Sequence, residues 1–349
     1  MDVLEIAGVK IGKGQPPFII AEVSANHNGD IGRALELLEV AKKSGAQAVK
    51  LQTYRADTIT IDCSKPDFLI PKGPWAGRRL YDLYDEAHTP WEWHGPLFER
   101  ARELGLIAFS SPFDETAIDF LETFDVPAYK VASFELLDLP LVRSMARTMK
   151  PIIMSTGMAN LKEIEDAVSA VRGEGNEQII LLHCVSSYPA KYEEANLKTI
   201  GALRDAFDCP IGLSDHTLGT SVSVAAVAME ASVIEKHFTL RRADGGADSA
   251  FSLEPDELKK LVEETGQAWS ALGHASFEQT EGEKENSLFR RSLYVVEDIA
   301  KGDVISVQNV RSIRPGFGLS PDMFSKIEGK KVTEDLERGT ALKMDYIEV

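Results

Sequence analysis

The chain has 349 residues, a length that allows one large domain with a small one, or two domains of medium size. Apolar residues make up 44% and charged residues 27%, which excludes a chain that is disordered throughout. The formal net charge is −17 and no long basic run is present, so we expect no nucleic-acid partner and no membrane partner. An anionic substrate would need a local group of cations to overcome this charge.

Cysteine usage and the start of the chain indicate the cellular compartment. Cys63, Cys184 and Cys209 are too scattered for a disulfide framework or a metal-binding pair. The first residues lack a basic stretch followed by an apolar one, and no apolar run approaches the length of a membrane span. We therefore expect a cytoplasmic protein.

Short β-rich apolar runs alternate with helical patterns over the first three quarters of the chain. Strands are predicted at 18–23, 48–52, 106–109, 128–132, 152–154, 179–184, 211–213 and 233–237. Helices are predicted at 31–44, 90–104, 115–124, 139–149, 161–172, 197–207, 219–231 and 255–272. This alternation predicts an α/β fold, a (β/α)8 TIM barrel. A doubly wound sheet, the main rival, normally has a glycine-rich turn after an early strand, and the turn at 24–29 has a single glycine.

The remaining segments complete the expected organisation. Residues 3–14 are predicted to form a hairpin that closes the barrel, and residues 53–89 form a long irregular insert of the kind that is usually functional. We expect a catalytic domain at 1–275, a polar linker at 276–290 and a small β-rich domain at 291–349, with strand-like runs at 292–296 and 341–344. The small domain is too short to bury a large hydrophobic core, so we expect it to be stabilised by contact with a partner.

Two lysines lie inside predicted strands. Lys50 belongs to the second strand and Lys130 to the fourth. Since a buried ammonium group requires an anionic partner, we expect both to face a site. They are joined at the strand ends by Ser111, Ser133, Ser155 and Ser214. Cations with several hydroxyl groups are what a phosphate group needs, because each of its oxygens requires a donor.

Two histidines follow neighbouring strands. His216 comes after the seventh predicted strand and His237 ends the eighth. Each alone would more often be a hydrogen-bonded structural residue, but at the ends of adjacent strands the two imidazoles favour a divalent metal site. Glu22, at the end of the first strand, is a candidate third participant, as a ligand or as a base.

A set of ordered motifs resembles the sialic acid synthase family. The motifs are AEV at 21–23, NHNG at 26–29, KLQTY at 50–54, SSPFD at 110–114, STGM at 155–158, HCVSSYP at 183–189, GLSDHTLG at 212–219 and EKHFTL at 235–240. The tail RSIRPGFGL at 311–319 is similar to the antifreeze-like (SAF) domain that closes those enzymes. The stretches 73–93 and 128–142 look most like the pseudaminic acid branch, with the N-acetylneuraminate and legionaminic acid branches as near alternatives.

The resemblance implies an activity, a cofactor and a set of roles. The family condenses phosphoenolpyruvate with an N-acetylated amino sugar, which for the pseudaminic branch is 2,4-diacetamido-2,4,6-trideoxy-L-altrose. His216 and His237 would hold a divalent ion, manganese before magnesium or cobalt, and Glu22 would handle a proton. Phosphoenolpyruvate would lie on Lys50, Ser111, Lys130, Ser133, Ser155, Ser186 and Ser214; Ser186 stands where the family commonly has Asn, and Ser111 where it commonly has Thr.

The sugar and the assembly follow from the same resemblance. Gln52, Glu135, Tyr188 and Asp248 would bind sugar hydroxyl or amide groups. Arg314 of a second copy would reach the barrel mouth, which implies a domain-swapped homodimer. Two other hypotheses remain at this point: a metal-dependent barrel hydrolase, which needs no phosphate-binding set, and a non-catalytic carbohydrate- or ice-binding protein that acts through the tail domain.

Overall fold

The computed structural model describes residues 3–73 and 75–348. Residues 1, 2, 74 and 349, which belong to the ends of the two expected domains and to the motif at 73–93, lie outside the described residues. The chain divides into two compact units, Met1–Gly273 and His274–Val349, and each is described by itself.

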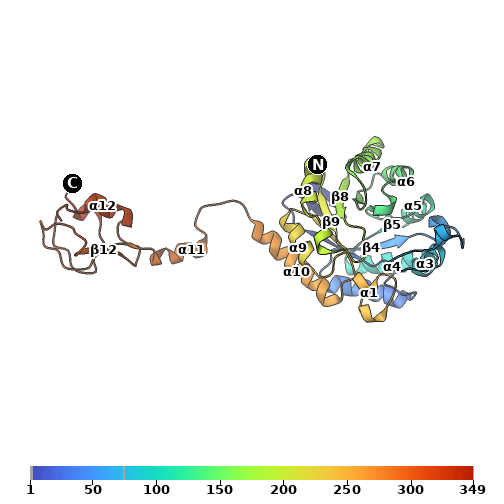
Figure 1. Ribbon diagram of the computed structural model, residues 1–349, viewed down its shortest axis with the longest axis horizontal. Coiled ribbons are helices and arrows are strands. Elements are labelled where there is room, and N and C mark those ends of the chain that lie inside the picture. Colours follow the sequence, from blue (N-terminus) through green and yellow to red (C-terminus); the bar gives the residue numbers. More distant parts are fainter. Residues whose placement is uncertain (1–2, 74, 349) are drawn as a thin grey trace. The chain divides into compact units, whose positions relative to one another are not determined.

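The first unit is a closed barrel of parallel strands (Figure 1) in the order β10-β3-β4-β5-β6-β7-β8-β9. The strands are β3 Phe18–Glu22, β4 Ala48–Thr53, β5 Ile107–Pro112, β6 Tyr129–Val131, β7 Ile152–Ser155, β8 Ile179–Cys184, β9 Ile211–Ser214 and β10 Val233–His237. The predicted (β/α)8 barrel is therefore confirmed. One difference matters for the site: β5 runs on to Pro112, so Ser111 lies within a strand and not after it.

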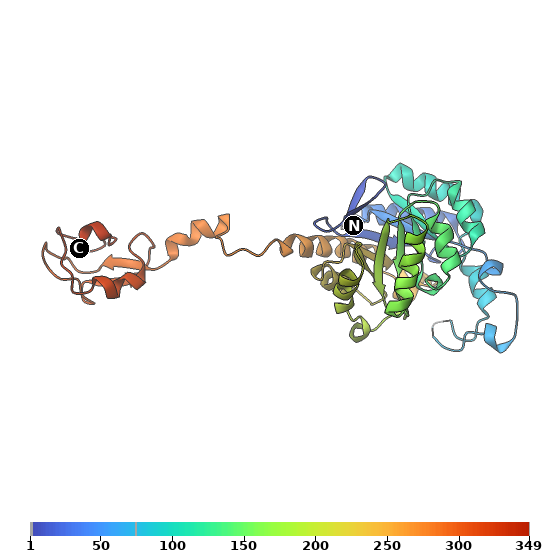
Figure 2. The ribbon, with the colours of Figure 1, turned by 90° about the horizontal axis from the view of Figure 1, so that it is seen from above.

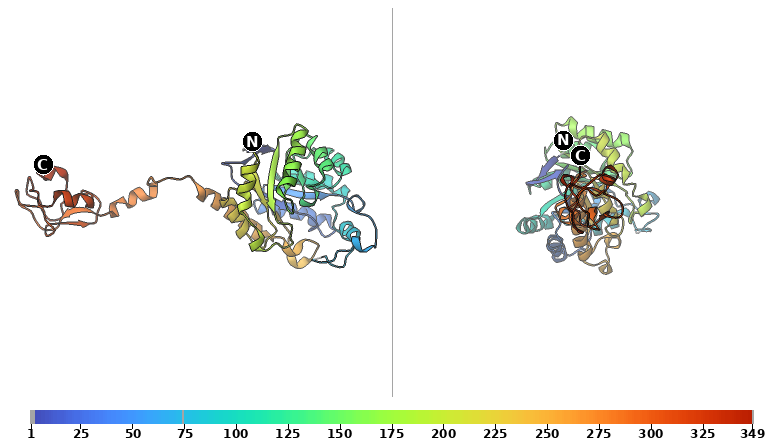
Figure 3. Two further views of the ribbon diagram at one scale, coloured as in Figure 1. Left: turned by 45° about the horizontal axis from the view of Figure 1, so that its top comes forward. Right: turned by 90° about the vertical axis from the view of Figure 1, so that its left-hand side faces the viewer.

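Helices surround the strands in the same unit (Figure 3). They are α1 Ile31–Lys43, α4 Trp91–Leu104, α5 Glu115–Glu122, α6 Leu139–Ala146, α7 Leu161–Gly173, α8 Lys198–Ala206, α9 Ser221–Ala228 and α10 Pro255–Leu272. Their starts follow the sequence signals: Asp30 and Asn160 accept hydrogen bonds from the first-turn amides of α1 and α7. Among the described residues, none of these helices combines the length and apolarity that a membrane crossing requires.

The barrel interior changes from apolar to charged along the strands. Alternate residues point inward, so Phe18, Ile20 and Ala48 fill the amino-terminal half together with the hairpin of β1 Val3–Ile6 and β2 Val9–Gly12. The hairpin was predicted, and it closes that end. Two residues further along each strand, the inward positions hold ionisable and hydroxyl groups, which is where the site begins.

The insert between β4 and α4 is not irregular throughout, and that prediction was wrong. It contains α2 Ala56–Ile59 and α3 Leu80–Ala87, and it stands out from the rest of the barrel unit in Figure 2 (light blue to cyan). Leu83 gives α3 a buried face. The antiparallel bridge between Leu69 and Arg79 holds the part before α3 as a turn.

The second unit has a small apolar core of its own. Its helices and strands are α11 Glu281–Asn286, β11 Ser292–Val295, β12 Val310–Ile313 and α12 Phe324–Ile327. Leu293, Ile305, Ile327 and Leu342 belong to its core. The strand expected at 341–344 is absent from the described residues, where Ala341 makes only an isolated bridge with Tyr294.

Candidate active site

A cavity of about 560 Å³ lies at the carboxyl ends of the barrel strands. Its floor comes from the inward positions of the strands and from the first residues that follow them. Floor residues include Lys50, Gln52, Lys130, Ser133, Ser155, Ser186, Ser214, His216, Glu235 and His237. The structure therefore brings most of the predicted phosphate set and the histidine pair to one place.

Two lysines and two glutamates form an ionic cluster beneath the cavity. Lys50 Nζ lies 2.5 Å from Glu22 Oε2 and 3.3 Å from Glu235 Oε1, and Lys130 Nζ lies 4.0 Å from the same Glu235 oxygen. All four side chains are nearly inaccessible to solvent. The anionic partners expected for the lysines are thus carboxylates of the chain itself.

Burial and charge shift the pKa values of this cluster in opposite directions. Burial lowers the pKa of Lys50 to about 8, although Glu235 opposes the shift. For Glu235, burial favours the neutral acid, but the Lys130 and Lys50 ammonium groups outweigh it and hold its pKa below the ordinary value. Glu235 is therefore ionised at neutral pH, and Lys50 loses its proton about one pH unit above neutrality.

Hydroxyl groups and one backbone amide surround the second lysine. Lys130 Nζ donates to Ser155 Oγ at 2.7 Å, and the amide of Gly157 donates to Ser133 Oγ at 3.2 Å. A side chain at Gly157 would place its Cβ 2.7 Å from Ser133 Oγ and against Ser186 Oγ, so both hydroxyl groups would have to turn away from their present positions. These donors converge in the way that a phosphate or carboxylate group needs.

The two histidines of the prediction lie next to each other. The ring centroids of His216 and His237 are 5.4 Å apart. His216 Nδ1 is hydrogen-bonded to the carbonyl of Val185 at 2.9 Å, which leaves Nε2 free, and His237 Nδ1 is buried without a hydrogen-bond partner among the described residues. Burial, followed by the neighbouring His216, lowers the pKa of His237 well below its ordinary value.

A neutral imidazole with a free nitrogen fits a divalent cation, and this is the form that burial favours for His237. Burial also lowers the pKa of His216, but the hydrogen bond and the charge of Cys184 outweigh it and raise that pKa above its ordinary value, so a cation would have to displace the His216 proton. No group of three or more His, Cys, Asp or Glu side chains that could hold a metal occurs in residues 3–73 and 75–348. The two histidines would therefore supply only part of the coordination, with the remainder left to water or substrate oxygens.

The predicted sugar-binding residues surround this pair. The ring of Tyr188 lies 4.4 Å from that of His216, between centroids. Asp248 accepts a hydrogen bond from Ser24 Oγ, and Gln52 Nε2 donates to the same hydroxyl oxygen at 2.9 Å. Burial raises the pKa of Asp248, as it does that of Glu135, which reaches about 7.

Three of the predicted site residues do not line the cavity. Glu22 and Ser111 are each 1% exposed and lie behind the lining, Glu22 being held by Lys50 and by Gln52 Nε2 at 3.4 Å. Arg314 lies in the second unit, at an exposed position before a cis proline, with no ion pair among the described residues. Its role at the site stays a prediction.

Glu235 and Trp75 are among the cavity residues to which sequence reasoning gave no role. Glu235 bridges both lysines and accepts a hydrogen bond from Ser214 Oγ at 3.1 Å. It stands two positions before His237 in β10, so the two-residue period of a strand places both on the inner face, and that signal was available. Trp75 lines the cavity from the insert.

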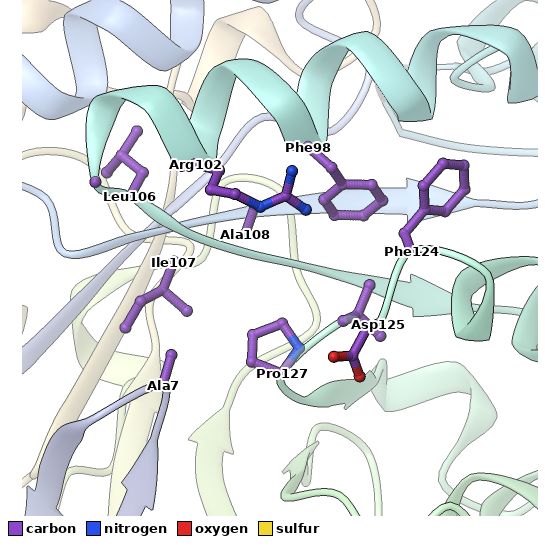
Figure 4. Close-up of a pocket in the computed structure, with 11 residues that line it drawn as sticks. Ala7, Phe98, Arg102, Leu106, Ile107, Ala108, Phe124, Asp125 and Pro127 are labelled. Carbon is purple, nitrogen blue, oxygen red and sulfur yellow. The ribbon is translucent and has the colours of Figure 1, made fainter.

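A second cavity, of about 330 Å³, lies at the amino-terminal ends of the strands (Figure 4). Phe98, Phe124 and Pro127 give it apolar sides, and Arg102 and Asp125 are its charged residues. It has no hydroxyl cluster and no imidazole. None of the predicted site residues is among the described residues that line it.

Comparisons with known proteins agree with this geometry. The NeuB family profile matches residues 37–277, and the SAF domain profile matches residues 290–348. The chain is 47% identical to a pseudaminic acid synthase of Campylobacter jejuni over 93% of this chain and 95% of that one, and 44% identical to a pseudaminic acid synthase of Helicobacter pylori over 96% and 98%. A crystal structure of N-acetylneuraminic acid synthetase from Leptospira borgpetersenii is 34% identical and superposes with a TM-score of 0.73, covering 81% of this chain and 94% of that one. The chain belongs to the NeuB family and carries a SAF domain at its C-terminal end.

Proposed function

We propose that this chain condenses phosphoenolpyruvate with 2,4-diacetamido-2,4,6-trideoxy-L-altrose, giving a nine-carbon nonulosonic acid and phosphate. The observation that carries the proposal is the buried cluster of lysines and hydroxyl groups beside an imidazole pair in one cavity. The pseudaminic acid synthases of Campylobacter and Helicobacter support the choice of sugar. A barrel hydrolase would have no use for the two lysines, and no finding favours it.

Phosphoenolpyruvate would occupy the floor of the cavity. Lys130, Ser155 and Ser133 offer donors to its phosphate, together with the Gly157 amide. Lys50 would turn from the glutamates toward the substrate carboxylate, with Ser186 and Ser214 nearby. Ser111 Oγ is buried with no hydrogen-bond partner among the described residues, so it is available to the same ligand.

The divalent ion, manganese before magnesium or cobalt, would be held by His216 and His237. When bound, it supplies Lewis-acid stabilisation of the negative charge that develops on the sugar aldehyde oxygen. The chain itself orients the two reactants. C3 of phosphoenolpyruvate forms a bond with the aldehyde carbon, water adds to C2, and the C2–O bond to phosphate then breaks.

Proton transfer is assigned to Glu22, with Glu135 beside the sugar. Glu22 is connected to the cavity through Gln52 and Lys50, so it can relay a proton of the attacking water or of the sugar oxygen. The raised pKa of Glu135, about 7, lets that carboxyl group donate a hydrogen bond as well as accept one at neutral pH. Tyr188 and Asp248 would contact sugar hydroxyl or amide groups.

The partner prediction also becomes a proposal: a domain-swapped homodimer in which Arg314 of a second copy completes the site. Large apolar side chains are exposed on the segments that follow β6 to β9, which supports an interaction surface there. They are Phe134, Leu137, Met158, Leu161, Tyr192 and Leu218. We keep the domain bounds at 1–275, 276–290 and 291–349, and the cytoplasmic location stays a prediction.

Subunit complementation tests the swap. Arg314→Ala and Lys130→Ala are each expected to be inactive, because each removes one half of every site. A mixed dimer would contain one intact site of two, so a co-expressed pool in which about half of the dimers are mixed should regain about a quarter of the native activity. No recovery in verified mixed dimers would contradict the swap.

The reaction itself is tested by phosphate release. The chain is mixed with phosphoenolpyruvate, Mn²⁺ and, in parallel, the proposed sugar, N-acetylmannosamine and the legionaminic acid precursor, and products are identified by mass spectrometry. The expected result is release with the proposed sugar above the other two. Release with none of them would overturn the proposal, and preference for either of the others would move the chain to that branch.

A further inference from the structure

The cavity has two chemically different halves. The strand ends supply the charged floor, whereas the insert supplies an apolar wall, which we define as Ile59, Ile70, Trp75, Leu83 and Phe113, the last contributed by the loop after β5. The proposed mechanism involves only the residues of the floor and gives the apolar wall no role.

The apolar wall is held in place by specific contacts. Trp75 Nε1 donates to the carbonyl of Ala247 at 2.9 Å, which ties the insert to the loop that carries Asp248. The amide of Ile70 donates to the carbonyl of Arg78 at 2.9 Å and fixes the turn before α3. The wall is therefore built before a ligand arrives, and its shape can discriminate between ligands.

The position of the wall relative to the imidazoles indicates which end of the sugar it meets. Tyr188 is adjacent to His216, and the ring of Trp75 lies 6.0 Å further on from that of Tyr188, between centroids. The aldehyde carbon, C1, reacts beside the imidazoles and the enolpyruvyl donor. The opposite end of the open-chain sugar, which carries C6, is the part that extends toward the wall.

We propose that the apolar wall of the insert selects amino sugars whose C6 is a methyl group over those with a C6 hydroxyl group. This inference rests on the proposed function and names its specificity-determining residues. A methyl group gains apolar contact with Ile59 and Ile70. A hydroxyl group would lose its water against these two side chains, which offer it no hydrogen-bond partner, and the indole N–H of Trp75 is already engaged. Tyr54, Tyr84 and Lys72 also line the cavity and leave donors for the other polar groups of the sugar.

The size of the preference follows from this chemistry. Apolar sites reject an added hydroxyl group only moderately, by about 10- to 100-fold. We therefore expect the native chain to use the 6-deoxy sugar with a kcat/KM about 10- to 100-fold above that for its 6-hydroxy counterpart, 2,4-diacetamido-2,4-dideoxy-L-altrose.

The test compares substitutions inside and outside the wall, with phosphate release from both sugars as the readout. Ile70→Thr and Ile59→Thr each put a hydroxyl group into the wall and should reduce the preference about tenfold, with the KM for phosphoenolpyruvate unchanged. Ile70→Val keeps the wall apolar, and Ile61→Thr changes an insert residue that is 58% exposed, so both should keep the native preference.

The outcomes separate this inference from the proposed function. A native chain that releases phosphate equally with both sugars would overturn the inference alone. So would an unchanged preference in whichever of Ile70→Thr and Ile59→Thr folds, as checked by thermal unfolding. No release by the native chain with either sugar would instead overturn the proposed function on which the inference rests.

Discussion

Two buried ionic clusters lie at the carboxyl end of the barrel, one facing outward and one inward. In the outward pair, Asp215 and Lys236 satisfy each other completely. Asp215 accepts from Lys236 Nζ at 2.8 Å, from Ser223 Oγ at 2.6 Å and from Thr217 at the amide and hydroxyl, and Lys236 also donates to the carbonyl of Thr217 at 2.6 Å. Every polar atom of this pair has a partner within the protein.

Around the inward cluster, by comparison, several buried polar atoms lack a hydrogen bond. Glu235 Oε2, Ser111 Oγ and His237 Nδ1 are buried and make no hydrogen bond within the described residues. Native proteins rarely bury polar atoms without partners unless a ligand, an ion or water completes them. Burial of charge alone therefore does not mark a site, whereas the buried polar atoms of the inward cluster that lack hydrogen bonds are available to a ligand. Four experiments test this contrast.

Replacing the inward lysine should have the largest effect. Lys130→Met removes a cation from the proposed phosphate position, and we expect kcat/KM for phosphoenolpyruvate to fall about 100- to 1,000-fold, the loss typical of one preorganised donor to a developing or bound charge. Steady-state phosphate release measures it. Activity within a few-fold of native in a folded variant would contradict the assignment.

Replacing the outward lysine should act on stability. Lys236→Met leaves Asp215 buried without its counter-ion, and breaking such a pair costs about 3 to 5 kcal/mol of unfolding free energy. Denaturant unfolding checks this value against native protein and against Lys130→Met, which should lose less because Glu235 keeps Lys50. Equal losses in the two variants would remove the distinction between the clusters.

The pH dependence of substrate binding should report Lys50. Its pKa is lowered to about 8, so the ammonium group loses its proton as pH rises through that value and attraction for an anion weakens. The KM for phosphoenolpyruvate should rise above about pH 8, approaching tenfold per pH unit. Lys50→Arg stays charged and should flatten this rise. If the KM of Lys50→Arg rose above pH 8 as steeply as that of the native chain, the titrating group would not be Lys50.

The smallest effects should come from two adjacent serines. Ser110 Oγ is hydrogen-bonded to Thr53 Oγ1 at 2.6 Å, so Ser110→Ala should cost about 1 kcal/mol of stability and leave the KM unchanged. Ser111→Ala removes a buried hydroxyl without a partner and should leave stability unchanged while it raises the KM for phosphoenolpyruvate. Thermal unfolding and the KM for phosphoenolpyruvate are measured for both variants. If Ser111→Ala lost stability and kept its KM, Ser111 would stabilise the fold and would not bind substrate.

Much of this arrangement was predictable because strand periodicity and strand-end chemistry are local signals. The alternation of apolar runs and helical patterns predicted the barrel, and the lysines at 50 and 130 predicted an inward charged layer. Neighbouring strands then placed His216 and His237 together. Glu235 would have followed from the same two-residue period.

Other features depend on long-range contacts that no local pattern encodes. Trp75 reaches the cavity because its indole binds Ala247, a contact across 172 positions of sequence. The helices of the insert were missed because its prolines and glycines mask two short helical segments. Ser111 was predicted as a strand-end residue, yet β5 continues past it and buries it.

The most direct test of the central claim is a crystal structure of the chain with phosphoenolpyruvate and Mn²⁺ bound. The account predicts phosphoenolpyruvate between Lys50 and Lys130 and an anomalous manganese peak between His216 and His237. Phosphoenolpyruvate bound elsewhere, or manganese away from the two imidazoles, would contradict it.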